Sequence, residues 1–143
     1  MSTEENKEIV RHFVEEAQSR GNISSVDQFL TTDFVDHGAL FGLPPTREGV
    51  KQLFTMLRTA FPDLHVTIHD QVAEGNKVVS RKTFHGSHQG ELMGSPATGK
   101  QVAFDVIDIL QLADGKITDH WVVVDQLGLL QQIGVIPAPG QAS

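Results

Sequence analysis

The spacing of apolar residues changes from a helical to a strand period near the middle of the chain. Up to Pro62, apolar positions recur at intervals of three and four residues, which predicts amphipathic helices. These helices are expected over residues 2–20, about 24–30 and 46–61. A capping box of Ser2 and Glu5 marks the start of the first helix, and Pro62 stops the third.

In the second half of the chain the alternation has a period of two, which is typical of strands with one buried face. Two strands meet at a turn at Gly75–Asn76, and two longer strands meet at Asp114–Gly115. A glycine-rich loop over residues 90–100 separates the two pairs. Residues 127–134 are expected to form a short helix, and the tail 135–143 is expected to be loose.

Helices followed by mostly antiparallel strands give the element order of an α+β protein. Three helices can cover only one face of such a sheet, so a pocket forms between them if the sheet curls around the helices. The other face of the sheet is then exposed to solvent or paired with a second subunit. We expect one domain over residues 1–143, with its core over about 5–134.

The register of the last hairpin decides which side chains share its inner face. A three-residue connection, with Gly115 in the left-handed conformation, places Asp108 opposite His120 on an apolar face. A two-residue type I′ turn at Asp114–Gly115 is the alternative, and it would turn His120 to the opposite face. We favour the first connection.

An acid and a histidine on an apolar wall must interact, because an isolated buried carboxylate is costly. In the favoured register the Cβ atoms of Asp108 and His120 would lie about 5 Å apart. The pair is interpreted either as a structural ion pair that fixes the hairpin or as a general acid–base site whose pKa values are tuned by burial. The remaining alternative is that one of the two side chains points to water.

Composition narrows the classes of function. The chain of 143 residues has a formal charge of −7, 11 scattered basic residues and no cysteine. This charge argues against nucleic-acid and anionic-membrane partners, and the lack of cysteine excludes disulfides, thiolate–metal sites and cysteine nucleophiles. The start "MSTEENKEIV" does not resemble a signal peptide, so a cytoplasmic protein is expected. His65 and His69 share a strand face without a third ligand at suitable spacing, so we expect no metal site.

Five stretches carry a family resemblance: "DFVDHG", "PPTREGVKQLF", "AFPDLHVTIHDQVAEGNKVV", "HGSHQGELMGSPATGK" and "DGKITDHWVVVDQLGLLQQIG". Their order and spacing, from about Val10 to Gly134, resemble the SnoaL-like polyketide cyclases, also called ester cyclases, of the nuclear-transport-factor-2-like superfamily. The resemblance implies a cone, in which a curved antiparallel sheet wraps around the N-terminal helices as an α+β barrel. It also implies an internal ligand cavity, a dimer, and ring closure by intramolecular aldol condensation without metal or Schiff base.

The match to the cyclases' site residues is partial. Their catalytic aspartate corresponds to Val122, which cannot transfer a proton, and a second site residue, a histidine, corresponds to Asp108. A neighbouring glutamine of the cyclases corresponds to Val106. The resemblance places Asp108 and His120 where the family points side chains inward, so we expect these two to be the catalytic pair.

Further residues are expected to contact the substrate. They come from the early "DFVDHG" strand, the helix stripes, the apolar strand face and the region of the glycine-rich loop, which could act as a lid. The expected substrate-binding residues are Asp36, His37, Phe13, Phe54, Phe61, His85, Met93, Phe104, Val106 and Val122.

We expect an enzyme without cofactor that uses acid–base chemistry on a small to medium hydrophobic carbonyl or ester compound. The reaction would be an aldol-type cyclisation, an isomerisation or an addition of water. Asp108 would be the base or would orient His120, the proton shuttle, while Asp36 and His37 would bind the oxygen on which charge develops. The alternatives are a hydrolase of the epoxide-hydrolase type and a non-catalytic dimeric module that binds a hydrophobic ligand. The expected partners are a small hydrophobic molecule and a second copy of the chain, with no nucleic acid and no membrane.

Overall fold

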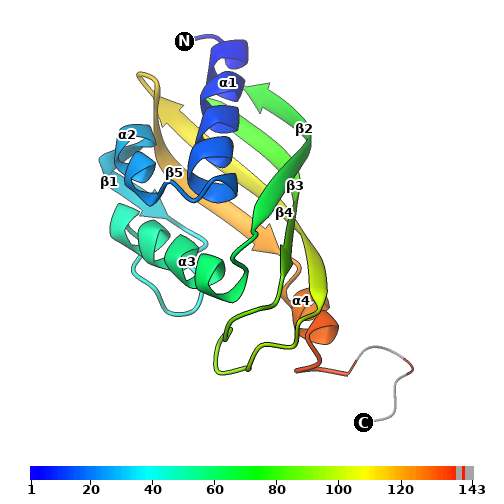
Figure 1. The fold of residues 1–143 in the computed structure, drawn as a ribbon. Coiled ribbons are helices and arrows are strands. Elements are labelled where there is room, and N and C mark those ends of the chain that lie inside the picture. Colours follow the sequence, from blue (N-terminus) through cyan, green and yellow to red (C-terminus); the bar gives the residue numbers. More distant parts are fainter. Residues whose placement is uncertain (138–139, 141–143) are drawn as a thin grey trace.

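Helices pack against one face of a mixed sheet, whose strands run diagonally through the molecule (Figure 1). The computed structural model describes residues 1–137 and 140, so most of the predicted loose tail lies outside the described residues. Within them, the strands form one five-stranded sheet in the order β1-β5-β4-β3-β2. The strands are β1 (Leu30–Asp36), β2 (His65–Glu74), β3 (Lys77–Ser87), β4 (Gln101–Ala113) and β5 (Lys116–Val124).

The helices begin at the predicted caps. The Ser2 hydroxyl accepts from the Glu5 N–H and the Glu5 carboxylate accepts from the Ser2 N–H, each at 3.1 Å, and Thr46 caps the third predicted helix. The first predicted helix ends in a π-helical turn, and the second is a 3₁₀ turn followed by one short α-helix. The segments are α1 (Thr3–Phe13), the π-turn Val14–Ser19, the 3₁₀ turn Ile23–Ser25, α2 (Val26–Phe29), α3 (Arg47–Ala60) and α4 (Gln126–Gln132).

One edge of the sheet departs from the predicted antiparallel arrangement. Strand β1 runs parallel to β5, with Asp36 as the partner of His120, whereas the other neighbouring strands are antiparallel. The pairing is long-range and leaves no local signal, because β1 and β5 are separated by α3 and three strands. It matters for the site, since it brings a carboxylate of the first strand beside the histidine of the last.

The hairpin at Asp114–Gly115 has two connecting residues, so the favoured three-residue connection is wrong. Both residues take the left-handed conformation, with φ of 50° and 80°, as a type I′ turn requires. Ala113 pairs with Lys116 directly across the turn. Aspartate tolerates a positive φ better than most residues, which allows this tighter turn.

A β-bulge nevertheless returns the acid and the histidine to one face. The register shifts by one residue beside Thr118, which has no partner on β4. Asp108 therefore pairs with Val122 and His120 with Leu110. Because a one-residue shift exchanges the two faces of a strand, the bulge cancels the effect of the shorter turn. Asp108 and His120 lie diagonally across the hairpin and both point toward the helices.

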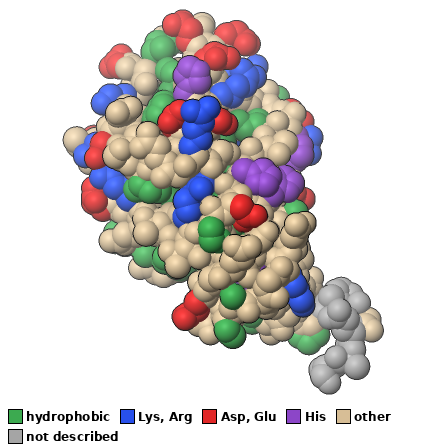
Figure 2. Space-filling view, viewed as in Figure 1, with side chains coloured by type: hydrophobic (Ala, Val, Ile, Leu, Met, Phe, Trp, Pro, Cys, Tyr) green, Lys and Arg blue, Asp and Glu red, His purple; other side chains and the backbone are tan. Residues whose placement is uncertain are grey.

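The two faces of the sheet differ in exposure. Along β4, the side chains that face the helices are buried and the alternate ones are more exposed. Ile107 and Val123, which pair across β4 and β5, leave 51% and 76% of their surface exposed. On the face drawn in Figure 2, acidic and basic side chains are interspersed. Within the described residues, each helix is too short or too polar to cross a bilayer.

Candidate active site

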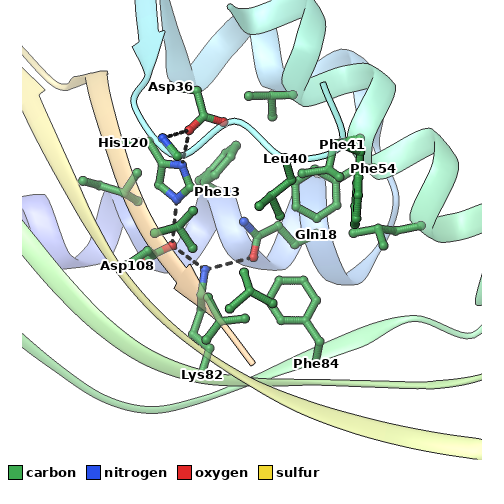
Figure 3. A pocket seen from close by; sticks show the side chains of 18 of the residues that line it. Phe13, Gln18, Asp36, Leu40, Phe41, Phe54, Lys82, Phe84, Asp108 and His120 are labelled. Carbon is green, nitrogen blue, oxygen red and sulfur yellow. Dashed lines mark hydrogen bonds and ion pairs between the residues drawn. The ribbon is translucent and has the colours of Figure 1, made fainter. Parts of the chain in front are cut away.

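A cavity of about 70 Å³ lies between the helices and the inner face of the sheet (Figure 3). Its wall is mostly apolar and is built by α1, the π-turn after it, β1, the loop after β1, α3, the inward positions of β3, β4 and β5, and α4. The apolar lining includes Phe13, Leu30, Phe34, Leu40, Phe41, Val50, Leu53, Phe54, Leu57, Phe84, Phe104, Val106, Leu110, Ile117, Val122, Val124 and Leu129. The polar side chains of the lining are Gln18, Asp36, Lys82, Asp108, His120 and Gln126.

Eight of the residues expected in the site line this cavity. They come from five different elements, so the fold collects them from most of the chain. These residues are Phe13, Asp36, Phe54, Phe104, Val106, Asp108, His120 and Val122.

His37 does not line the cavity, although it was expected to contact the substrate. It follows Asp36, and neighbouring side chains of an extended segment point to opposite sides. With Asp36 inward, the His37 ring lies outside, stacked on Trp121 at 4.6 Å between ring centroids. Its Nε2 lies 2.9 Å from a carboxylate oxygen of Asp119.

Three other expected contacts also lie elsewhere. Phe61 follows the last residue of α3 and is buried beyond the cavity, with its ring centroid 5.7 Å from that of His88. His85 is on the outer face of β3, where its ring stacks on that of His65. Met93 is 56% exposed in the loop after β3. The structure therefore does not bring the tip of that loop to the cavity.

A chain of polar contacts crosses the sheet side of the cavity (Figure 3). His120 Nδ1 lies 3.1 Å from Asp36 Oδ1, and His120 Nε2 lies 3.3 Å from Asp108 Oδ2. The Lys82 ammonium donates to Asp108 Oδ2 at 2.7 Å and to Gln18 Oε1 at 3.3 Å. The imidazole of His120 thus lies between two carboxylates, and one of these also has a lysine partner.

Local structure fixes the Asp36 end of this chain. Asp36 is the last residue of β1, and its Oδ1 also accepts from the Gly38 N–H at 3.0 Å. Gly38 packs directly on β5, since a Cβ at this position would lie 2.6 Å from Val122 Cγ1. A glycine is therefore needed where the loop crosses the cavity wall.

The environment of Asp108 keeps it ionised. Burial opposes its charge, but the Lys82 ammonium and the hydrogen bond from His120 outweigh burial and lower the pKa of Asp108 from 3.8 to about 2. Asp108 is 2% exposed and Lys82 is 1% exposed, so water screens this pair little. A carboxylate with so low a pKa is a weak base at neutral pH.

The environment of His120 favours its charged form. Burial disfavours an imidazolium, yet the hydrogen bonds to Asp108 and Asp36 prevail and raise the pKa of His120 above its ordinary value of 6.5. Both ring nitrogens can donate only in the imidazolium, and each has a carboxylate acceptor. Positive and negative charges then alternate along Asp36, His120, Asp108 and Lys82.

Lys82 is the charged residue of the site that the sequence analysis missed. The signal was present, because Val78, Ser80 and Phe84 share the strand parity of Lys82, and all four are buried. A lysine within such an inward row is unusual, since buried lysines need a partner. Gln18 and the loop residues Leu40 and Phe41 were missed as well, and neither helix ends nor loops give a comparable pattern.

Acid should remove part of the stability that Asp108 provides. Its folded pKa of about 2 lies below the ordinary 3.8, so its stabilising contribution is present above about pH 4 and is lost as the pH falls toward 2. We expect the free energy of unfolding of the wild type to fall across this interval, and that of Asp108→Asn to fall less. Urea unfolding at a series of pH values tests this. Equal slopes for the two proteins would contradict it.

Fold and site together define an α+β protein with an internal, mostly apolar cavity that contains a cluster of charged side chains. The chain belongs to the SnoaL-like polyketide cyclase family, whose family model matches residues 8–133. This match confirms the resemblance inferred from the sequence.

Two curated relatives are named as cyclases. Over 130 residues the chain is 32% identical to the aklanonic acid methyl ester cyclase DnrD of Streptomyces peucetius, covering 89% of each chain. It is 27% identical to the nogalonic acid methyl ester cyclase of Streptomyces nogalater, over 82% of this chain and 90% of the relative. Among solved structures, TsrD from Streptomyces laurentii is 29% identical, with a TM-score of 0.85 over 95% of this chain and 99% of TsrD.

Proposed function

We propose that the protein closes a ring by intramolecular aldol chemistry in a small to medium hydrophobic carbonyl or ester compound. The observation that carries this proposal is the position of His120, which sits between two carboxylates on the wall of an otherwise apolar cavity. The names of the curated relatives, both methyl ester cyclases, support the reaction class. Burial in an apolar site strengthens the electrostatic interactions that such chemistry needs.

Asp36 is the proposed base. Its Oδ1 accepts from Gly38 and contacts His120, and Oδ2 makes none of the hydrogen bonds found among the described residues. Oδ2 is thus the carboxylate oxygen available to remove a proton from the carbon beside a substrate carbonyl. The resulting enolate carbon attacks the second carbonyl carbon, which forms the new carbon–carbon bond and leaves an alkoxide.

His120 is the proposed acid. Its imidazolium gives the Nδ1 proton to the alkoxide oxygen as the 3.1 Å contact with Asp36 opens, and the Asp36 carboxyl then rotates and returns its proton to Nδ1. The protons balance, so the product is an isomer of the substrate and no co-reactant is consumed. Of the two roles expected for Asp108, orienting His120 fits its low pKa better than acting as the base.

The experiment is a direct assay of ring closure. The protein is incubated with a short acyclic 1,5-diketone and, separately, with aklanonic acid methyl ester, and the cyclic isomer is followed by chromatography and mass spectrometry. We expect faster ring closure of at least one compound than in buffer, with no change of mass before any loss of water. Binding of both compounds without acceleration would favour the non-catalytic module and contradict the proposal.

We further propose that the protein is a homodimer that pairs through the outer face of the sheet. The adjacent Ile107 and Val123 leave 51% and 76% of their surface exposed there, and contiguous exposed apolar residues favour an interface. Val123→Asp should convert the dimer into a monomer by light scattering. Leu127→Asp is the matched control, because Leu127 is similarly exposed at 57% on α4 and should leave the dimer intact. A monomeric wild type would contradict this proposal.

A further inference from the structure

Gln18 offers the cavity a hydrogen-bond donor that the described residues leave unused. The Lys82 ammonium donates to Gln18 Oε1 at 3.3 Å, and an ammonium can only donate, so this contact fixes which end of the amide faces the lysine. The amide nitrogen Nε2 is turned away from Lys82 (Figure 3). Nε2 makes none of the hydrogen bonds among the described residues, and it is not one of their unpaired atoms that are sealed from solvent. Since Gln18 is only 5% exposed and lines the cavity, this accessible donor is available to a bound ligand.

The backbone that carries Gln18 is fixed by contacts with α3 and β2. Gln18 lies in the π-turn after α1, and π-helical turns are frequent at functional sites. The Arg58 guanidinium donates to the carbonyl oxygens of Gln18 and Ser19. The Ser19 hydroxyl accepts from the Val66 N–H at 2.8 Å. With its backbone held by Arg58 and its amide oxygen by Lys82, the donor is oriented before a ligand binds and needs little reorganisation during a reaction.

The other polar side chains of the cavity are less suited to bind a substrate carbonyl. The two carboxylates carry no donor when ionised, and His120 is the proposed acid for the alkoxide. Lys82 is 1% exposed and already has two acceptors. Gln126 is exposed at the start of α4, and its amide makes none of the hydrogen bonds among the described residues. Gln18 therefore supplies the buried and oriented donor of the cavity.

We infer that Gln18 is a further catalytic residue, whose Nε2 donates to the substrate carbonyl oxygen that becomes the enolate oxygen. Removal of the neighbouring proton by Asp36 places negative charge on this oxygen, and an oriented donor in an apolar site stabilises that charge. The amide gives a hydrogen bond and transfers no proton, so the proton balance of the reaction is unchanged. His120 then serves the second carbonyl oxygen. This inference rests on the proposed function, because it concerns the enolate formed there.

The first test measures the bond to the carbonyl oxygen without ring closure. Cyclohexanone has one carbonyl group, so it can bind and enolise but cannot close a ring. Its ¹³C-labelled carbonyl is followed by infrared difference spectroscopy in the wild type, Gln18→Met and Gln18→Glu. Methionine removes donor and acceptor, whereas glutamate keeps an acceptor for Lys82 and removes only the donor. We expect a lower C=O stretching frequency in the wild type than in either variant, because a donated hydrogen bond weakens the carbonyl bond.

The second test measures enolate formation. In D₂O, the protons beside the carbonyl of cyclohexanone should exchange for deuterium faster with the wild type than in buffer, as followed by NMR. Gln18→Met should slow this exchange by about 10²- to 10³-fold or to the rate in buffer, as expected for the loss of one oxyanion donor. Asp36→Asn should also slow it but keep the low C=O frequency. Gln28→Met, at an exposed glutamine of α2, is the matched control and should change neither.

Either Gln18 variant that folds decides the question. An equal C=O frequency in the wild type and that variant, unchanged exchange in that variant, or the lack of a bound-ketone signal would overturn the inference. Ring closure that persists in Gln18→Met would leave the proposed function standing without this residue. A C=O shift that depends on Gln18, in a protein that closes no ring, would support the donor and contradict the proposed function.

Discussion

Asp36→Asn is expected to lower the kcat for ring closure by about 10²- to 10⁴-fold, the usual contribution of a general base. Asparagine keeps an oxygen that can accept from Gly38 and from His120, so the loop after β1 should stay in place. It cannot take up the proton from the carbon beside the carbonyl. The loss should therefore appear in kcat, with a melting temperature close to that of the wild type.

His37→Gln is the matched control for this prediction. His37 is the next residue along the chain, but its ring stacks on Trp121 outside the cavity. The change should leave kcat within about threefold of the wild type, because surface substitutions away from special features have small effects. If Asp36→Asn retained full activity, or if both variants lost activity equally, Asp36 would not be the base.

Asp108→Leu is expected to lower the free energy of unfolding by about 3–5 kcal/mol, the usual cost of removing one partner of a buried ion pair. Lys82 is 1% exposed and its Nζ lies 2.7 Å from Asp108 Oδ2. Without the carboxylate, the ammonium would keep only the Gln18 carbonyl as an acceptor. Chemical denaturation with urea measures the loss.

The double variant Asp108→Leu with Lys82→Met separates this pair from the rest of the cluster. The single variant Asp108→Leu and the double variant both deprive His120 of its Asp108 partner, so this loss does not affect the comparison between them. The double variant should recover most of the lost stability, because a buried pair can often be replaced by apolar side chains at little cost. A double variant as unstable as the sum of the two single variants would show that the two charges are not coupled.

The sequence predicts the local elements well and the long-range pairing less well. The capping box at Ser2, the stop at Pro62 and the period-two strands follow from near neighbours along the chain, and each is observed. The parallel pairing of β1 with β5 depends on residues more than 80 positions apart, such as Asp36 and His120. No local pattern encodes this pairing, so the contact between Asp36 and His120, on which the site depends, was not predicted.

The hairpin shows why a correct face can follow from a wrong register. The favoured register and the family resemblance placed Asp108 and His120 together on the inner face, where both are found. Periodicity alone does not separate the two registers. It does not report a turn and a bulge that compensate each other, as the shorter turn at Gly115 and the unpaired Thr118 do. The direct opposition predicted for the two residues is therefore replaced by a diagonal contact of 3.3 Å.

Side-chain direction explains which of the expected site residues line the cavity. Strand parity places Phe104, Val106 and Val122 in the cavity wall. Parity also turns His37 and His85 away from the cavity, although both were expected to contact the substrate. Applied to β3, the same parity would have found Lys82.

The protonation state of His120 is the most direct test of the account, because the proposed acid must carry its proton before the reaction begins. A ¹⁵N NMR titration of the histidine rings measures it. We predict that both ring nitrogens of His120 are protonated at neutral pH, with a pKa above 6.5 that falls in both Asp108→Asn and Asp36→Asn. A neutral His120 ring with a pKa at or below 6.5, unchanged in these two variants, would contradict the account.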